Sequence, residues 1–247
     1  MAQGTLSLVL GLPDNIHACL FDLDGVLTDT AAVHRAAWKC VFDIVLAAHG
    51  MPEFTDDDYA EYVDGKPRLN GTRDFLASRD LHVDEGSDND PPDAETIRAI
   101  AARKNNEVRK RIKEDGVAVF PGSKRYLEAA VEADLRRVVV SSSANTEDVL
   151  HVTGLETFIE HRVDGVTIVQ QDLAGKPAPD SFLMGARLAG VDARRAAVFE
   201  DATSGVEAGR RVEFGFVVGV NRLEDAQSDA LGAQGADIAV TEFGGVR

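Results

Sequence analysis

Two short apolar runs of this chain each lead directly into a pair of acidic residues. The run Ala-Cys-Leu-Phe precedes Asp22 and Asp24, and the run Ala-Ala-Val-Phe precedes Glu200 and Asp201. Short apolar runs that stop at polar residues are typical of buried strands in a parallel sheet. Because the carboxyl ends of parallel strands lie at one edge of the sheet, we expect up to four carboxylates to meet there.

The remaining sequence alternates strand-like and helix-like segments, as parallel βαβ units do. Strands are expected at 18–23, 137–142, 196–200, 216–220 and 238–241, with a weaker one near Val163. Helices are expected at 123–133, 146–152, 179–189 and 204–211. This alternation predicts an α/β fold with a doubly wound, Rossmann-like parallel sheet as its core.

The segment between the first two strands is too long for a single crossover. Residues 31–116 read almost wholly as helix, apart from an acidic stretch at 84–93. That stretch lacks the glycine and the distal glutamate of a calcium-binding loop, so we interpret it as a solvated surface loop. We therefore expect an inserted helical cap domain at 31–116 and a core domain formed by 1–30 and 117–247.

The charge balance bears on the partners of this chain. Its 42 acidic residues outnumber 26 basic ones, and a net charge of -16 without a basic stripe argues against nucleic acid. No apolar run approaches the roughly 20 residues that span a bilayer. Cys19 and Cys40 form neither a disulfide framework nor a metal-ligand spacing. We expect a cytoplasmic protein, either a monomer or a weak dimer, that acts on a small molecule.

The paired acids require a positive charge nearby. Asp22 and Asp24 are two residues apart, so in an extended chain their side chains point the same way. Two carboxylates about 4 Å apart repel each other by roughly 4 kcal/mol at an effective dielectric of about 20. Carboxylate ligands without a neighbouring His or Cys cluster suit Mg²⁺. A strand end followed by a turn is the simpler interpretation of either acidic pair alone.

Two further segments offer groups that could bind phosphate. Lys176 lies in Gly-Lys-Pro-Ala-Pro-Asp, where the prolines favour a fixed loop before a helix. The strand at 137–142 runs into three serines and Asn145 just before a helix, and the free N–H groups of a helix start favour anions. A surface lysine and an ordinary helix cap are the simpler interpretations.

Together these segments predict phosphoryl transfer through an aspartate. Asp22 is the expected nucleophile, because an ionised carboxylate can attack phosphorus once a cation offsets the charge of the phosphate. Asp24 is placed to act as the general acid and base. Lys176, Ser141 and Ser142 are expected to contact the transferring phosphate.

The four segments, in this order, resemble the haloacid dehalogenase superfamily. Its hallmarks are Asp-x-Asp on the first strand, a Ser or Thr on the second, a lysine, and a late acidic pair. The resemblance implies that the first aspartate is phosphorylated, that the second is the acid/base, and that the metal binds between them and the late acids. The implied ligands of Mg²⁺ are Asp22, Asp24, Glu200 and Asp201.

The first strand and the helix after it look most like one family of this superfamily, the β-phosphoglucomutases. The likeness lies in Phe-Asp-Leu-Asp-Gly-Val-Leu-Thr-Asp-Thr-Ala at 21–31, followed by His34, Trp38 and Lys39. It implies that Thr30 lies at the hinge to the cap and that His34 hydrogen-bonds the acid/base. It also implies substrate contacts for residues of the cap and the serine segment: Arg68, Lys104, Ser143 and Asn145.

Two positions depart from that family, which carries lysines where this chain has Asp64 and Ala144. Lys66 is a candidate substitute for the first of them. The resemblance implies a mutase that interconverts β-D-glucose 1-phosphate and glucose 6-phosphate through an aspartyl-phosphate enzyme and glucose 1,6-bisphosphate. An Mg²⁺-dependent phosphatase of small sugar phosphates is the alternative. A non-catalytic receiver that accepts phosphate on an aspartate is a more remote one, and turnover of a phosphosugar would exclude it.

Overall fold

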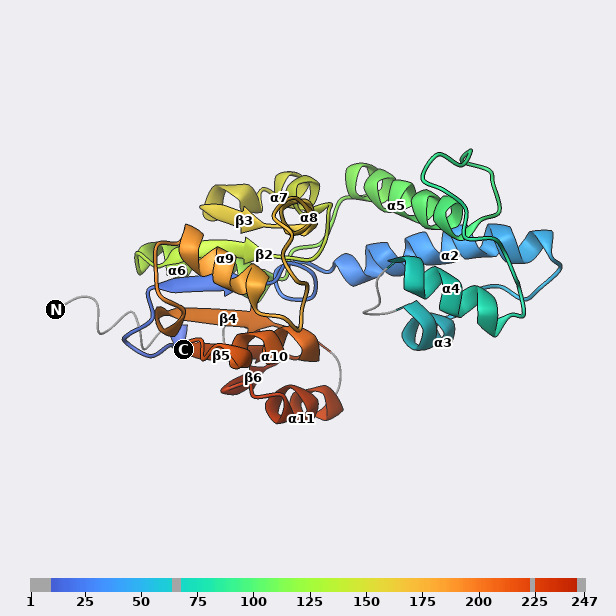
Figure 1. The fold of residues 1–247 in the computed structure, drawn as a ribbon. Coiled ribbons are helices and arrows are strands. Elements are labelled where there is room, and N and C mark those ends of the chain that lie inside the picture. Colours follow the sequence, from blue (N-terminus) through green and yellow to red (C-terminus); the bar gives the residue numbers. More distant parts are fainter. Residues whose placement is uncertain (1–9, 64–67, 223–224, 244–247) are drawn as a thin grey trace. The chain divides into compact units, whose positions relative to one another are not determined.

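The structure is a computed structural model that describes residues 10–63, 68–222 and 225–243. The chain divides into two compact units, one formed by 1–30 and 117–247 and the other by 31–116 (Figure 1). The first unit contains the sheet, and the second consists of helices and loops. No helix among the described residues is long and apolar enough to cross a bilayer.

A six-stranded, wholly parallel sheet forms the centre of the first unit. Its strands are β1 (Ala18–Phe21), β2 (Arg136–Val140), β3 (His161–Val163), β4 (Ala196–Glu200), β5 (Phe216–Val220) and β6 (Ile238–Val240). They lie in the order β3-β2-β1-β4-β5-β6. The strand order therefore reverses between β1 and β4, where open α/β sheets hold their ligands. The predicted α/β fold with a doubly wound parallel sheet is confirmed.

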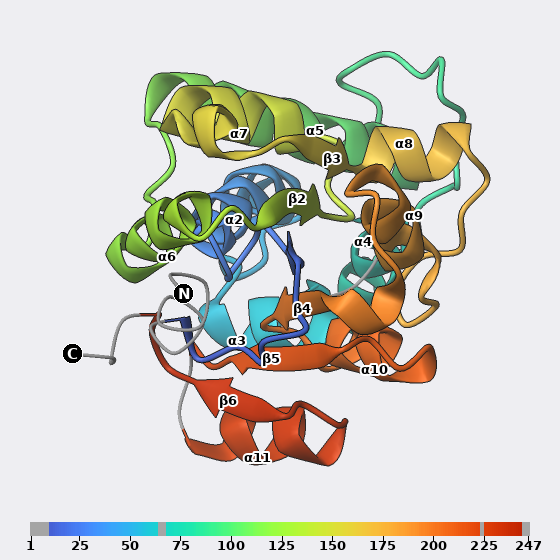
Figure 2. The ribbon, with the colours of Figure 1, turned by 90° about the vertical axis from the view of Figure 1, so that its left-hand side faces the viewer.

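Helices cover both faces of the sheet (Figure 2). They are α6 (Pro121–Glu132), α7 (Thr146–Thr153), α8 (Gly165–Gln170), α9 (Asp180–Leu188), α10 (Thr203–Arg211) and α11 (Asp225–Ala233). Because side chains alternate along a strand, β1 serves two cores. Leu20 packs in a cluster that includes Phe182 of α9 and Val206 of α10. Phe21 instead contacts the ring of Tyr126 on α6 and stacks on Phe199.

The second unit is helical around an aromatic core. Its helices are α2 (Thr30–Ala48, which begins at the last residue of the first unit), α3 (Asp56–Asp58), the π-helical turn η1 (Tyr59–Val63), α4 (Arg68–Ser78) and α5 (Ile97–Glu114). Phe42 and Phe75 are fully buried, and their ring centroids lie 4.2 Å apart. The acidic stretch at 84–93 is a largely exposed loop. Within it Asp90 accepts hydrogen bonds from Ser87, and it also accepts one from Thr96 just before α5, so protein groups hold this carboxylate.

The sequence missed two helices of the first unit. α8 has only six residues, none of them buried, and so short a segment cannot show a helical period. The sequence also did not predict α11. The strands β1 and β2 also stop two residues before their expected ends, because the chain turns away from the sheet where its polar residues begin.

Candidate active site

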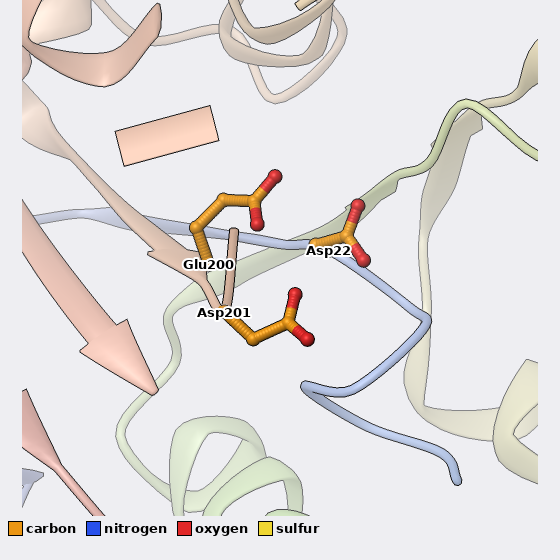
Figure 3. A group of neighbouring side chains, drawn as sticks. All are labelled: Asp22, Glu200 and Asp201. Atoms are coloured by element: carbon orange, nitrogen blue, oxygen red, sulfur yellow. The ribbon is translucent and has the colours of Figure 1, made fainter. Parts of the chain in front are cut away.

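The ends of β1 and β4 bring three carboxylates together. Phe21 pairs with Phe199, and the next backbone N–H, that of Asp22, donates to the carbonyl of Phe199 at 2.9 Å. The register therefore sets Asp22 beside Glu200, with Asp201 one residue further. Figure 3 shows the three side chains directed toward a common space. One carboxylate oxygen of each lies within 4.8 Å of the others.

Lys176 supplies a positive charge to this group. Its Nζ donates to Asp22 Oδ1 and to Glu200 Oε1, each at 2.5 Å, and to the carbonyl of Val140 at 3.3 Å. The ammonium also lies 4.9 Å from the centroid of the Phe182 ring. Only 9% of the Lys176 side chain is exposed, so the two ion pairs are poorly screened by solvent. The lysine thus joins the ends of β1, β2 and β4.

Burial and mutual repulsion shift the protonation of these acids. Burial, with contributions from Glu200 and Asp24, raises the pKa of Asp22 to about 8 although Lys176 opposes the shift. Burial and the charges of Glu200 and Asp22 likewise raise the pKa of Asp201 well above its ordinary value. Burial alone would lower the pKa of Lys176, but the two carboxylates outweigh it and raise that pKa. The protein groups alone therefore leave the site short of positive charge.

Two glycines make room for these carboxylates. Gly25 has a left-handed backbone (φ +80°), and a β-carbon there would collide with the carboxylate of Asp201. A β-carbon at Gly205 would collide with the side chain of Glu200. The backbone N–H of Ala202 donates to Glu200 Oε2 at 2.9 Å, so both oxygens of Glu200 are held. Sequence reasoning did not single out either glycine, although both closely follow an acidic pair.

Asp24 lies beyond the end of β1, in a tight turn. The N–H of Gly25 donates to the carbonyl of Thr28 at 2.8 Å, and the N–H of Thr28 donates to the carbonyl of Leu23 at 3.0 Å. The hydroxyl of Thr30 donates to Asp24 Oδ1. Asp24 is partly exposed, unlike Asp22, so its carboxyl can reach a ligand. Thr30 was expected at a hinge, and its contact with Asp24 adds a role that its sequence position did not reveal.

The serine segment after β2 organises its own backbone. The N–H of Ser143 donates to Ser141 Oγ at 3.1 Å, and the N–H of Asn145 donates to Ser143 Oγ at 3.2 Å. Ser141 is buried and Ser142 is exposed. Asn145, the residue before α7, is buried and makes no side-chain capping bond to that helix. Since the hydroxyls of Ser141 and Ser143 act as acceptors in these two bonds, each keeps its hydrogen for donation to a ligand.

Comparisons with known proteins identify the family. A family model described as haloacid dehalogenase-like hydrolase matches residues 16–213. The chain belongs to the haloacid dehalogenase-like hydrolases. The β-phosphoglucomutase of Mycobacterium bovis is 53% identical to it over 245 residues, which cover 96% of this chain and 94% of that protein. The chain is therefore an enzyme of this family, as its sequence suggested.

Two further relatives widen the comparison. The fructose-1-phosphate phosphatase YqaB of Escherichia coli is 30% identical and covers 77% of this chain and 89% of its own length. The crystal structure of β-phosphoglucomutase from Clostridium difficile has a TM-score of 0.69 and 25% identity, and the match covers 92% of each chain. The haloacid dehalogenase-like fold thus extends over the helical unit as well as the sheet.

The helical unit of this haloacid dehalogenase-like hydrolase carries the remaining candidate residues. Lys104 Nζ lies 2.7 Å from His34 Nδ1 and 4.8 Å from the centroid of the Trp38 ring. Lys104 is buried on α5. Arg68 is the first residue of α4 and is exposed. Asp64 and Lys66 lie outside the described residues.

The donor set at the sheet edge fits a hard divalent cation. Asp22, Glu200 and Asp201 offer only carboxylate oxygens, which are the ligands that Mg²⁺ prefers. Burial and mutual repulsion raise the pKa of Asp22 and of Asp201, and a divalent cation bound there would favour their ionised forms. The side chain of Asp24 does not belong to this group, so it would serve the metal only through its backbone.

Proposed function

We propose that this chain is a phosphosugar mutase that interconverts β-D-glucose 1-phosphate and glucose 6-phosphate through glucose 1,6-bisphosphate. The observation that carries the proposal is the buried group at the sheet edge, where Lys176 bonds two of three convergent carboxylates. Identity of 53% to a protein named β-phosphoglucomutase over nearly the whole chain supports the same substrate.

Asp22 is the proposed nucleophile and forms an aspartyl-phosphate. One of its oxygens is bonded to Lys176, which orients the carboxylate and offsets charge on the phosphate that it attacks. The proposed Mg²⁺ ligands are Asp22, Glu200 and Asp201 with the backbone carbonyl of Asp24. Mg²⁺ bound there would keep the carboxylates ionised and offset the charge of the transferring phosphoryl group.

Asp24 is the proposed general acid and base. It gives a proton to the sugar oxygen that leaves and takes one from the sugar hydroxyl that attacks the aspartyl-phosphate. The hydroxyl of Thr30 donates to Asp24 Oδ1, which leaves the second oxygen to face the reacting group. Ser141 and Ser142 are proposed to donate to the transferring phosphate from the end of β2.

The helical unit at 31–116 is the proposed cap domain, and residues 1–30 and 117–247 form the proposed core domain. A mutase must exclude water while the aspartyl-phosphate persists, and a closing cap does so. Arg68 is proposed to hold the non-transferring phosphate, since its planar fork matches phosphate oxygens, with Ser143 and Asn145 as partners. Lys104 is proposed to contact the sugar. His34 accepts from Lys104 at Nδ1, so its Nε2 carries the proton that it would donate.

A phosphatase of small sugar phosphates is the second candidate. The similarity to the fructose-1-phosphate phosphatase of Escherichia coli favours it, because such an enzyme uses the same groups and differs in admitting water. The two candidates are separated by incubating the protein with β-D-glucose 1-phosphate, Mg²⁺ and a trace of glucose 1,6-bisphosphate. Formation of glucose 6-phosphate without release of phosphate selects the mutase, and stoichiometric release selects the phosphatase.

Asp22→Asn tests the nucleophile within the same assay. The substitution keeps the size of the side chain and removes the attacking charge, so we expect turnover to be abolished in a protein that remains folded. Asp29→Asn is a matched control, since Asp29 lies on the same segment outside the carboxylate group. Activity of Asp22→Asn near that of the unsubstituted protein would contradict the aspartyl-phosphate.

A further inference from the structure

Arg222 reaches from the end of β5 to the turn that contains Asp24. Its Nε donates to the carbonyl of Gly25 at 2.8 Å, and its Nη2 donates to the carbonyl of Val26 at 2.9 Å. These are the two residues that directly follow Asp24. One planar guanidinium therefore holds two consecutive carbonyls of the turn, in a geometry that the single ammonium of a lysine cannot reproduce.

The guanidinium of Arg222 is itself fixed by its surroundings. It lies 3.8 Å from the centroid of the Phe120 ring, and its Nη1 donates to the carbonyl of Thr241 at 3.1 Å. Its Nη2 also lies 3.2 Å from the hydroxyl of Ser123. That hydroxyl donates to the carbonyl of Val26 at 2.6 Å, so this carbonyl accepts from two side chains. Ser123 is fully buried, which protects the bond from competing water.

Different interactions hold the chain at Asp22 and at Asp24. Asp22 is held by the sheet, because its N–H donates to the carbonyl of Phe199 on β4. Asp24 follows the last ladder bond of β1, so its backbone depends on the turn for its position, while Thr30 holds its carboxylate. Arg222 and Ser123 both donate from outside the turn to the carbonyls that follow Asp24. A loss of Arg222 would therefore displace Asp24 while leaving Asp22 in place.

We propose that Arg222 is a positioning residue: it holds Asp24, the proposed general acid and base, in place for proton transfer. This inference rests on the proposed function, in which Asp24 protonates the leaving oxygen of a sugar phosphate. Arg222 does not contact the reacting atoms. Its effect should consequently depend on whether the leaving group needs a proton.

Two phosphoryl donors separate these cases. With a sugar phosphate, a bond forms between an Asp22 oxygen and phosphorus, the phosphorus–sugar oxygen bond breaks, and the sugar oxygen takes its proton from Asp24. With acetyl phosphate the same bond to Asp22 forms and acetate leaves as an anion, so no proton is transferred. Both reactions require Asp22, Lys176 and a filled Mg²⁺ site, and only the first requires the carboxyl of Asp24 as an acid.

The experiment measures phosphorylation of Asp22 in single turnovers as radiolabelled, hydroxylamine-sensitive protein. Mg²⁺ is kept saturating for every variant, so that a weaker bond from the Asp24 carbonyl to the metal does not limit either reaction. We expect Arg222→Lys to slow transfer from β-glucose 1,6-bisphosphate by about 10-fold and Arg222→Gln by about 100-fold, as misplacement of a catalytic group does. Transfer from acetyl phosphate should change by less than about 3-fold, because no acid acts there. Arg194→Gln, which removes an exposed arginine of the same unit, is the control and should change neither rate.

Ser123→Ala provides a second variant in case Arg222 variants fail to fold. It removes the other donor to the Val26 carbonyl and should slow the sugar-phosphate reaction alone. Equal slowing of both reactions in these variants, or an Arg222→Lys variant that retains the full sugar-phosphate rate, would overturn the positioning role. An unsubstituted protein that is phosphorylated by acetyl phosphate but by no sugar phosphate would instead refute the proposed function.

Discussion

Replacement of Lys176 by methionine tests the electrostatics of the site most directly. Methionine keeps most of the length of the side chain and removes its charge. The ammonium makes two ion pairs of 2.5 Å and its side chain is 9% exposed. Removing one partner from a buried ion pair costs about 3 to 5 kcal/mol. For a chain of this size, that loss should lower the melting temperature by roughly 6 to 20 °C.

The substitution should lower the melting temperature, but it should increase the stabilisation that Mg²⁺ provides. Lys176 and the cation share the carboxylates of Asp22 and Glu200, so loss of the ammonium leaves more negative charge for the metal. We expect Mg²⁺ to raise the melting temperature of Lys176→Met by more than it raises that of the unsubstituted protein. Turnover should nevertheless fall by about 100-fold or more, since a charge that stabilises the transition state is lost.

Calorimetry with increasing Mg²⁺, beside the mutase assay, measures both effects. Lys124→Met is the matched control, because Lys124 is exposed on α6 of the same unit. It should change neither the melting temperature nor its dependence on Mg²⁺. If Mg²⁺ stabilises Lys176→Met no more than the unsubstituted protein, then Lys176 and the metal do not share these carboxylates, and the account of the site is wrong.

Three further predictions concern the pH dependence of stability, the glycine beside Asp201 and the arginine at the start of α4. Without Mg²⁺ the free energy of unfolding should fall as the pH rises, because the folded protein raises the pKa of Asp22 from 3.8 to about 8. The stabilisation from Asp22 is complete below its unfolded pKa and lost above its folded pKa, and between them the free energy of unfolding falls by at most about 1.4 kcal/mol per pH unit. Denaturant titrations at several pH values should show a weaker pH dependence in Asp22→Asn. An unchanged pH dependence would contradict the assignment. Gly25→Ala should cost about 1 to 2 kcal/mol for its left-handed backbone and also weaken Mg²⁺ binding by displacing Asp201. Gly190→Ala, at φ +71° with open space around it, should show the same loss in calorimetry with normal Mg²⁺ affinity, and equal affinities in the two variants would exclude the collision. Arg68→Ala should reduce mutase flux more than hydrolysis of a small phosphate ester, and equal losses in the two assays would argue against a distal phosphate site.

The sheet and its acidic edge could be predicted because their signals are local. β1 and β4 are uninterrupted apolar runs of four residues before their acids, and parallel strands must end at one edge. Asp22 and Glu200 were brought together from that rule alone, and Lys176 was added because the paired acids require a positive charge nearby. The direct bond from Thr30 to Asp24 could not be foreseen, because it depends on the fold of one tight turn.

Arg222 shows why other parts of the site were missed. Its partners Gly25, Val26 and Ser123 are separated from it by 197, 196 and 99 residues. No periodicity or spacing encodes such contacts, and an isolated arginine after a strand is an ordinary surface residue in sequence terms. α8 was missed for a different reason, since its six residues are too few to show a helical period.

The stacked rings of Phe21 and Phe199, with centroids 4.6 Å apart, lie one residue below Asp22 and Glu200. This buried aromatic pair thus fixes the spacing of the two acidic residues without contacting the reacting groups. Trimming either ring to leucine would loosen the spacing of two carboxylates before it unfolded the protein. A screen that ranks interior substitutions by thermal stability alone would therefore overlook such losses of activity. A turnover assay on the same variants would reveal the losses.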